Sequence, residues 1–242
     1  DSLQALVQDE GGVDATLASG RRLRAELAFG ADGAVSRVRE LAGIGWRGGS
    51  YGQRAIVAYV RCERGHEDTC WQRFLPSGPL AFLPCADGRC SIVWTMANAD
   101  ADRALSLDDA RFGSELERAF DARLGRVVEV SARRAFPLSR HLAEGMLQGR
   151  VALLGDAAHV VHPLPGQGVN LGLRDVAALQ ETMRAARAAG RDPAGPRLQR
   201  WARTRASENA LAAHSFAAVN QVFSNDALLP TLIETGCAFV TT

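Results

Sequence analysis

Hydrophobic and polar positions alternate with a period of two along much of the first hundred residues, which predicts a series of short strands. Residues 13–17 alternate, a Ser19-Gly20 turn follows, and residues 23–29 alternate again, so this stretch predicts a β-hairpin. Such short, evenly spaced strands predict an antiparallel sheet in the next part of the chain. Its strands are expected over residues 54–61, 70–75, 80–84 and 90–96.

Helical spacing of apolar positions takes over in the second half of the chain. There a sharply apolar strand, residues 150–155, leads into a glycine-rich loop and a long helix in which Val176, Leu179 and Met183 recur at helical spacing. The predicted helices span residues 36–41, 107–124 with a cap near Ser106, about 170–189, and about 198–223. Strands and helices together predict an α/β protein, with α+β character within this chain.

Composition removes several classes of protein. The 242 residues carry 28 basic and 27 acidic side chains, and this near balance excludes a general nucleic-acid binder. A hydrophobic fraction of 47% excludes a disordered chain. No apolar run approaches the roughly 18 residues that cross a bilayer. The 5 cysteines are odd in number and none are paired as Cys-x-x-Cys, so reduced thiols are expected and no metal site.

Residues 149–170 carry the strongest chemical pattern. Their apolar strand is expected to end at Gly155-Asp156, and open parallel sheets bind ligands beyond the carboxyl ends of their strands. A carboxylate at that point can accept hydrogen bonds from sugar or polyol hydroxyls. Gly166 and Gly168 let the backbone approach a flat ligand closely. The positive end of the helix that begins near Asn170 favours a ligand that becomes negative, such as a reduced flavin.

A second strand-to-turn segment runs from residue 29 to residue 39. Its strand ends in a turn at Asp32-Gly33, and a short helix follows. The turn can approach a phosphate or a ribose, and Arg37 or Arg39 can pair with phosphate. Taken alone, the segment is equally well explained as an ordinary turn, because Asp-Gly is a common turn dipeptide.

In this order along the chain, the two segments resemble motifs of the flavin-dependent aromatic hydroxylases. Residues 31–39 are similar to that family's Asp-Gly motif, which contacts flavin and pyridine nucleotide, and residues 155–159 to its Gly-Asp motif. Further segments resemble the ubiquinone-biosynthesis branch of the family. They are Tyr51-Gly-Gln53, His66, residues 73–84, residues 91–94, Phe136-Pro-Leu138, Trp201 with Arg205, and residues 222–225.

The resemblance implies a division of the chain into parts. A partial Rossmann-like FAD-binding domain carries the two motifs, an antiparallel β-sheet forms the substrate domain, and helices close the chain. The expected boundaries are 1–45 for the Asp-Gly part, 46–140 for the substrate domain, 141–190 for the Gly-Asp part and 191–242 for the C-terminal helical region.

The resemblance also implies FAD as cofactor and NAD(P)H as reductant. Asp156 would hold the ribityl chain, Pro163 would present backbone at the edge of the ring, and Val169 and Asn170 would offer N–H groups to its pyrimidine end. The cofactor-binding residues expected on this basis are Asp32, Gly33, Arg37, Gly155, Asp156, Pro163, Gly166, Gln167, Gly168, Val169 and Asn170.

Aromatic and apolar residues of the expected sheet are candidates for a substrate wall, although each is at least as well explained as sheet core. They are Phe74, Phe82, Leu83, Pro84 and Trp94. No catalytic residue is assigned firmly. His159 is expected to be structural and satisfied by backbone, and His162, nearer the expected flavin edge, is a candidate catalytic base.

One part of the family pattern is missing. The family opens with a strand and a Gly-x-Gly-x-x-Gly turn that holds the ADP part of FAD, and nothing in this chain matches it. We therefore expect the chain to be a C-terminal fragment that is inactive by itself. Whether it binds FAD alone is left open.

The activity implied for the complete protein is hydroxylation of the aromatic ring of a polyprenylated ubiquinone precursor, a polyprenyl phenol or quinol, with NAD(P)H and O2. Two alternatives stay open: a non-catalytic assembly module, and a related flavoprotein that epoxidises or reduces a lipid. We expect a cytoplasmic protein with peripheral contact to the inner membrane or to a multi-enzyme assembly, and no nucleic-acid partner. Arginines between residues 184 and 205 could meet anionic lipid heads, although such runs are more often solvated faces.

Overall fold

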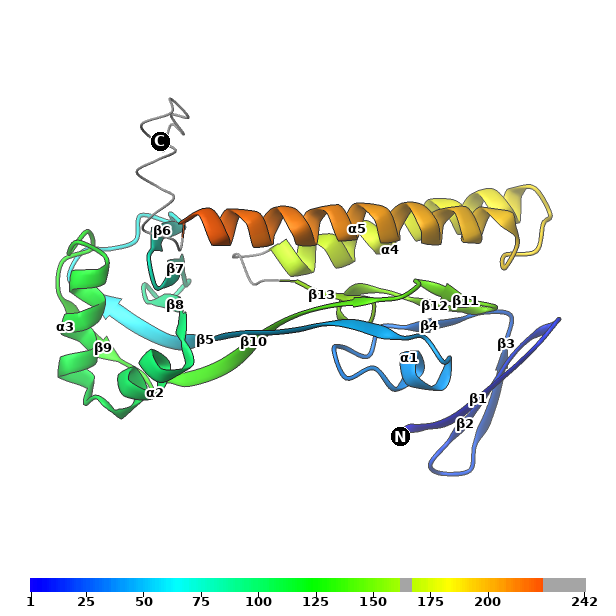
Figure 1. The fold of residues 1–242 in the computed structure, drawn as a ribbon, viewed down its shortest axis with the longest axis horizontal. Coiled ribbons are helices and arrows are strands. Elements are labelled where there is room, and N and C mark those ends of the chain that lie inside the picture. Colours follow the sequence, from blue (N-terminus) through cyan, green and yellow to red (C-terminus); the bar gives the residue numbers. More distant parts are fainter. Residues whose placement is uncertain (162–166, 224–242) are drawn as a thin grey trace. The chain divides into compact units, whose positions relative to one another are not determined.

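The computed structural model describes residues 1–161 and 167–223 (Figure 1). The chain divides into two compact units. One comprises residues 1–49 and 139–215, and the other is built on residues 50–138. The expected division at 45/46, 140/141 and 190/191 stays a prediction.

The first unit opens with an antiparallel sheet whose strands follow one another in the order β1-β2-β3. The strands are β1 (Leu3–Asp9), β2 (Gly12–Leu17) and β3 (Arg22–Ala25). The sequence predicted β2 and β3 as a hairpin but continued the second strand to residue 29. The structure instead ends β3 at Ala25 and starts a new strand, β4 (Ala28–Gly30). Apolar and polar residues keep alternating from β3 into β4, because every strand has a period of two. The alternation therefore cannot show that β3 pairs with β2 whereas β4 pairs with β12.

The second sheet of this unit has the order β11-β12-β4. Its members are β11 (Leu147–Gln148) and β12 (Val151–Leu153), which run antiparallel, and β4, which pairs with β12 in parallel. All three residues of β12 are buried, as expected for a central strand of a parallel pair. This parallel pairing, together with the helices of the unit, confirms the predicted α/β class with a partial Rossmann-like sheet.

Helices surround the β11-β12-β4 sheet. Helix α1 (Arg37–Leu41) is capped by Ser36, whose hydroxyl accepts a hydrogen bond from the backbone N–H of Arg39. The 3₁₀ turn η1 (Gly155–Ala157) follows β12, and the strand β13 (His159–Val160) follows η1. The long helices are α4 (Gln167–Ala188) and α5 (Pro196–Phe223), which lie side by side (Figure 1).

Two predicted helix ends shift in the structure. Helix α4 begins at Gln167 rather than near Asn170, and α5 begins at Pro196 rather than near residue 198. Pro196 occupies the first position of α5. Proline is well suited there, because the backbone N–H that it lacks would have had no partner within the helix.

The third sheet is large and antiparallel, with the strand order β13-β10-β5-β8-β7-β6. Strand β9 also pairs with β5. Most of these strands lie within residues 50–138 of the second unit. The strands are β5 (Trp46–Cys62), β6 (Trp71–Leu75), β7 (Gly78–Pro84), β8 (Cys90–Ala97), β9 (Val127–Val130) and β10 (Arg134–Ala143). The predicted antiparallel sheet is thus present, and β5 is longer than expected. Its added residues include Gly48, where a Cβ would lie 1.8 Å from the carbonyl oxygen of Arg140.

The helix predicted over residues 107–124 is present but shorter, and the helix that precedes it was not predicted. The structure has two helices, α2 (Asn98–Ser106) and α3 (Asp109–Ala119), separated at Leu107 and Asp108. The carboxylate of Asp108 accepts a hydrogen bond of 2.8 Å from the backbone N–H of Arg111 and so caps α3. Ser106, expected to be the cap, instead ends α2 and donates to the carbonyl of Arg103.

Candidate functional site

Parallel pairing of β4 with β12 brings the two motif segments together. Phe29 pairs with Ala152 and Gly30 with Leu153, and the N–H of Leu154 donates to the carbonyl of Gly30 at 2.9 Å. Because parallel strands end at the same edge of a sheet, the Asp32-Gly33 turn and the Gly155-Asp156 turn emerge next to each other. Two segments far apart in the sequence thus form one surface.

Arg39 ties these two turns to each other. Its guanidinium donates to the carbonyl of Ala34 after the first turn at 3.1 Å and to the carbonyl of Ala157 in the second at 3.0 Å. The side chain is largely buried and lies 3.8 Å from the ring centre of Trp46. The sequence had offered Arg39 as a phosphate partner, but a guanidinium occupied in this way positions the backbone of the site instead.

Asp32 also has a role within its own turn. Its carboxylate accepts hydrogen bonds from the hydroxyl of Ser36 and, at 3.0 Å, from the backbone N–H of Val38. Partial desolvation raises the pKa of Asp32, but these hydrogen bonds outweigh it and leave the pKa below its usual value. Arg37 points away from the turn, since it pairs with Glu40 at 2.8 Å and reaches the carbonyl of Gln4.

A groove of about 360 Å³ lies where the two turns meet the first turns of α4. Asp156, at its wall, is exposed and makes no hydrogen bond or ion pair with any residue of the described ranges. The groove is lined by Ala31, Gly33, Leu154, Gly155, Asp156, Val169, Gly172, Leu173 and Val176. Four of the predicted cofactor residues, Gly33, Gly155, Asp156 and Val169, therefore share one cavity.

Helix α4 approaches the Gly155 turn very closely at Gly172. A Cβ on Gly172 would lie only 3.3 Å from the Cα of Gly155, and Gly155 itself has a φ of +55°, which favours glycine. The glycines predicted to let the backbone approach a flat ligand were Gly166, which lies outside the described residues, and Gly168, where a Cβ would meet only the side chain of Val161 at an ordinary 3.8 Å. Nothing in the spacing of the glycines distinguishes Gly168 from Gly172 without knowledge of how the helix packs.

Helix α4 presents an apolar surface to this groove. Val169, Leu173 and Val176 follow one another at helical spacing, and such an apolar stripe usually faces the core. Their side chains are nevertheless 72%, 61% and 50% exposed. Val176 was expected to share a buried face with Leu179 and Met183, but it lies at the exposed edge of that face and lines the groove. Helix α4 carries no acidic residue in its first turn, so no side chain there offsets the positive end of its dipole.

Beneath the groove, the buried carboxylate of Asp175 gathers four donors. His159 Nε2 lies 2.6 Å from it, Arg205 Nε donates at 2.8 Å, Asn209 Nδ2 at 3.1 Å and the backbone N–H of Gly155 at 3.3 Å. Burial raises the pKa of Asp175, but the hydrogen bonds and the charged neighbours prevail and hold it below its usual value. One carboxylate thus joins α4, α5 and the Gly-Asp turn.

Sequence reasoning missed Asp175, although a signal was present. It lies midway between Leu171 and Leu179 at intervals of four, so an acidic residue occupies the buried face of the helix. His159 is structural as predicted, but the expected backbone partner was wrong: the carboxylate of Asp175 holds it. Its Nδ1 is buried and has no hydrogen-bond partner among the described residues.

The other predicted cofactor residues divide into two groups. Pro163 and Gly166, with the candidate base His162, lie outside the described residues. The remaining three, Gln167, Gly168 and Asn170, belong to the first turn of α4. Their backbone N–H groups are those that a helix leaves without partners in its own ladder, so they stay candidates for binding an anionic or electron-rich ring edge.

Two of the proposed substrate-wall residues are core residues instead. The ring centre of Phe82 lies 4.4 Å from that of Phe120, and the ring centre of Trp94 lies 6.0 Å from that of Phe112 on α3. Leu83 follows Phe82 in β7, so its side chain points to the opposite face of the sheet. There it is partly exposed. Phe74, on β6, and Pro84, at the end of β7, are also accessible.

Comparison with known proteins identifies the family of this site. A model of the FAD-binding domain family matches residues 1–198. The chain belongs to the FAD-binding domain family. The match extends over both motif segments, β12, η1 and the whole of α4, so the groove of this FAD-binding domain falls entirely within it.

Relatives and solved structures agree with this assignment. The chain is 44% identical to the ubiquinone hydroxylase UbiL of Rhodospirillum rubrum over 93% of its own length and 52% of the relative. It is 40% identical to the 3-demethoxyubiquinol 3-hydroxylase of Escherichia coli over 96% of this chain and 59% of the relative. The chain therefore spans between half and three-fifths of the length of these relatives. PqsL of P. aeruginosa, solved with 2-aminobenzoylacetate, has the same fold, with a TM-score of 0.78 and 22% identity over 96% of this chain and 65% of that one.

The residues of the FAD-binding domain suit the cofactor. The exposed Asp156 carboxylate, which forms no ion pair with any cation in the described parts of the chain, offers acceptors for polyol hydroxyls. The exposed Val169, Leu173 and Val176 give an apolar surface for a planar ring system. In the described part of the chain, no helix is both long enough and apolar enough to span a membrane.

Proposed function

We propose that the chain contributes the flavin-side half of an NAD(P)H- and O2-dependent monooxygenase that hydroxylates the aromatic ring of a polyprenylated ubiquinone precursor. The observation that carries the proposal is the convergence of the Asp-Gly and Gly-Asp turns on one groove, in a chain 44% identical to a ubiquinone hydroxylase. The groove supports FAD binding, and the relatives' names support the substrate class.

Each element of the groove has a part in this proposal. The carboxylate of Asp156 would accept hydrogen bonds from the ribityl hydroxyls, and the N–H groups of Val169 and Asn170 would bind the polar edge of the ring. Gly33 leaves room for the ribose or phosphate next to the first turn. FAD supplies the redox chemistry when bound, and the protein supplies position and electrostatics.

The positive end of α4 has a specific consequence for that chemistry. A flavin gains negative charge on reduction, and a helix N-terminus stabilises nearby negative charge. The first turn of α4 therefore favours the reduced cofactor. The buried Asp175 network and Arg39 keep the two turns in place, so both act as positioning residues.

The substrate side of the proposal rests on the second unit. A polyprenyl phenol needs an apolar surface, and the partly exposed Leu83, Pro84 and Phe74 remain candidates for it, now without Phe82 and Trp94. Hydroxylation consumes one O2 and one NAD(P)H per ring, with water as the second oxygen product. The class of substrate then predicts that NAD(P)H consumption depends on a prenylated phenol.

Product analysis with the complete flavoprotein tests this proposal. The protein is given NADPH or NADH, O2 and a polyprenyl phenol, and products are identified by mass spectrometry. We expect an added oxygen on the ring and NAD(P)H oxidation that the phenol accelerates. A phenol lacking the prenyl chain serves as the matched control and should be a poorer substrate. A flavoprotein that leaves every polyprenyl phenol unchanged, or that places the oxygen on the chain, contradicts the proposal.

A further inference from the structure

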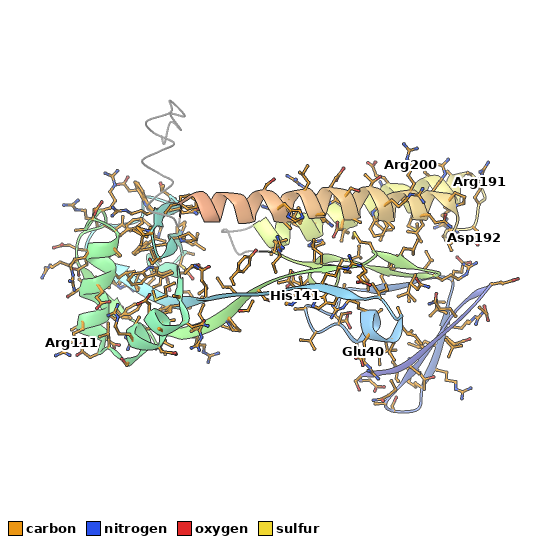
Figure 2. The ribbon with its side chains drawn as sticks, in the orientation of Figure 1. Glu40, Arg111, His141, Arg191, Asp192 and Arg200 are labelled. Carbon is orange, nitrogen blue, oxygen red and sulfur yellow. The ribbon has the colours of Figure 1, made fainter. Side chains whose placement is uncertain are left out.

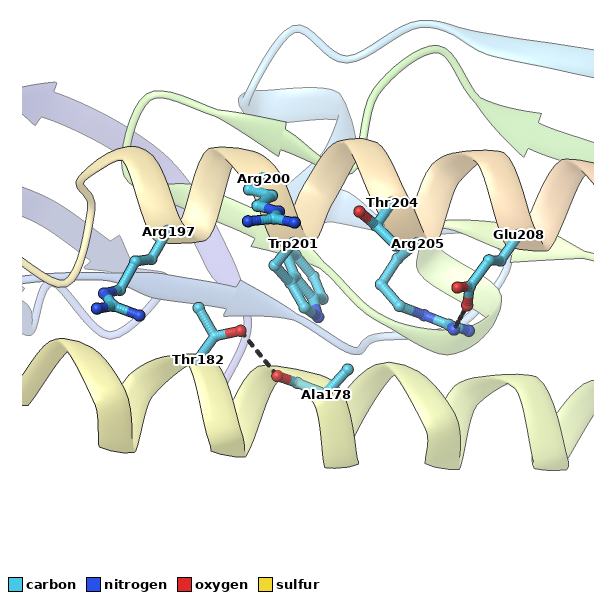
Figure 3. A pocket seen from close by; sticks show the side chains of 8 residues that line it. All are labelled: Ala178, Thr182, Arg197, Arg200, Trp201, Thr204, Arg205 and Glu208. Carbon is cyan, nitrogen blue, oxygen red and sulfur yellow. Dashed lines mark hydrogen bonds and ion pairs between the residues drawn. The ribbon is translucent and has the colours of Figure 1, made fainter.

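A second groove, separate from the flavin groove, lies between the two long helices. Its volume is about 320 Å³, and it shares no lining residue with the groove at the Gly-Asp turn (Figure 3). Helix α4 contributes Ala178 and Thr182, and α5 contributes Arg197, Arg200, Trp201, Thr204, Arg205 and Glu208. The α5 residues recur at intervals of three and four, so they form one face of that helix.

Positive charge in this groove is only partly compensated. Arg205 is buried and fully engaged, because it pairs with both Asp175 and Glu208. The carboxylate of Glu208, the one acidic group in the lining, is thereby neutralised. Arg197 and Arg200 are exposed and form no ion pair with any residue in the described ranges. Two guanidinium groups three positions apart are thus available to a ligand.

Two threonines and a rigid floor complete the groove. The hydroxyl of Thr182 donates to the carbonyl of Ala178 at 2.8 Å, which leaves its oxygen able to accept, and Thr204 lies on the opposite helix (Figure 3). Trp201 is 4% exposed, and its indole N–H donates to the carbonyl of Asp175 at 3.3 Å. The floor is therefore fixed, while the arginines at the rim are free to close on a ligand.

We propose that this groove binds the phosphate group of an anionic ligand through Arg197 and Arg200. Guanidinium forks bind phosphate oxygens in pairs, and neighbouring hydroxyl groups are frequent additional partners. The inference concerns a site outside the flavin groove and does not depend on the hydroxylase activity. It depends on the unpaired arginines and on the shape of the groove.

The surroundings of the groove favour a phospholipid headgroup as the source of that phosphate. Arg187 and Arg191, near the turn between α4 and α5, are also exposed and form no ion pair within the described chain. Figure 2 shows Arg191 and Arg200 extending outward from the same helix pair. Clustered basic side chains attract anionic membrane surfaces, with roughly a fivefold gain in binding for each residue. A soluble phosphate compound has the same chemistry and is the second source to be tested.

Two binding measurements on the purified, flavin-loaded protein distinguish these sources. The first follows the Nε–Hε NMR signals of the arginines during titration with inorganic phosphate at constant ionic strength. The second measures flotation with vesicles of phosphatidylglycerol and phosphatidylcholine against vesicles of phosphatidylcholine alone. The variants are Arg197→Ala and Arg200→Ala. Arg203→Ala is the matched control, because Arg203 is an exposed arginine of α5 that lines a different surface.

We expect saturable phosphate shifts at Arg197 and Arg200, and binding to the anionic vesicles. Each groove variant should weaken binding about fivefold and the double variant about thirtyfold, whereas Arg203→Ala should change it less than twofold. Shifts without vesicle binding would support the site with a soluble phosphate ligand, and vesicle binding without shifts would support the headgroup alone. Equal losses for Arg203→Ala, or no binding in either measurement, would overturn the proposal. Melting temperature and flavin content confirm that the variants are folded.

Discussion

Asp175 illustrates how one side chain can hold several elements in place. Its carboxylate is completely buried, yet two cationic or polar groups of α5, the ring of His159 and the N–H of Gly155 all contact it. A buried carboxylate of this kind is tolerated only when it is paired and hydrogen-bonded. Removing it leaves the buried guanidinium of Arg205 with Glu208 as its one charged partner among the described residues, and breaking a buried pair costs more than the pair itself contributes.

We therefore expect Asp175→Asn to lower the free energy of unfolding by about 3–5 kcal/mol. Urea denaturation followed by circular dichroism measures the change. The control is Asp102→Asn, which breaks the exposed ion pair with Arg54 and should cost about 0–1 kcal/mol. Similar losses for the two variants would show that the Asp175 network does not support the fold.

The same carboxylate predicts how stability depends on pH. Because the pKa of Asp175 in the folded protein is below its usual value, the unfolded chain takes up its proton first as pH falls. The contribution is complete above about pH 4 and is lost as pH falls toward the lower folded pKa. The difference in unfolding free energy between the wild type and Asp175→Asn should shrink as pH falls below about pH 4. A constant difference would refute the assignment.

At the scale of elements, the sequence predicted the two turns better than it predicted which strands and side chains join them. Each motif was recognisable because a strand, a small-residue turn and a helix follow one another locally. The parallel pairing of β4 with β12, and the bridging role of Arg39, were not predictable, because they depend on contacts between residues far apart in the sequence. The alternation through residues 23–29 concealed the change of sheet for the same reason.

Comparison of substitutions at Arg39 and at Arg37 tests whether Arg39 bridges the two turns. Arg39→Met keeps the apolar stem but leaves the buried carbonyl of Ala157 without its donor, so we expect a loss of about 1–3 kcal/mol in unfolding free energy. Arg37→Met, on the same short helix, removes only an exposed pair with Glu40 and should cost about 0–1 kcal/mol. Chemical denaturation measures the unfolding free energy of both variants. Equal losses would contradict the proposed role of Arg39 as a bridge between the two turns.

The contact between α4 and the Gly-Asp turn gives a second test at this scale. Gly172→Ala places a Cβ 3.3 Å from the Cα of Gly155, so the helix or the turn must move. Crowding of about 1–3 kcal/mol that falls on the groove weakens FAD binding about 5- to 150-fold. Gly113→Ala in α3 is the control, because its Cβ would meet Val127 at an ordinary 3.5 Å. A Gly172→Ala protein with normal FAD affinity would show that the close approach is not needed.

At the scale of the whole molecule, the flavin groove is assembled from three separate stretches, residues 31–33, 154–156 and 169–176. The sequence identified the first two by motif and the start of the third by resemblance. It missed Gly172, Leu173 and Val176, since an apolar helix face is expected to be buried rather than to line a ligand site. The sequence also could not show that Phe82 is buried and Leu83 partly exposed, because this depends on which face of the sheet is covered.

FAD titration of an Asp156→Ala variant tests the central claim, that the groove at the two turns is the flavin site. The measurement compares FAD affinity of the complete protein, its Asp156→Ala variant and an Asp100→Ala control that removes an exposed carboxylate on α2. We predict that Asp156→Ala loses FAD while remaining folded, and that Asp100→Ala binds it normally. Full FAD occupancy in Asp156→Ala would contradict the account.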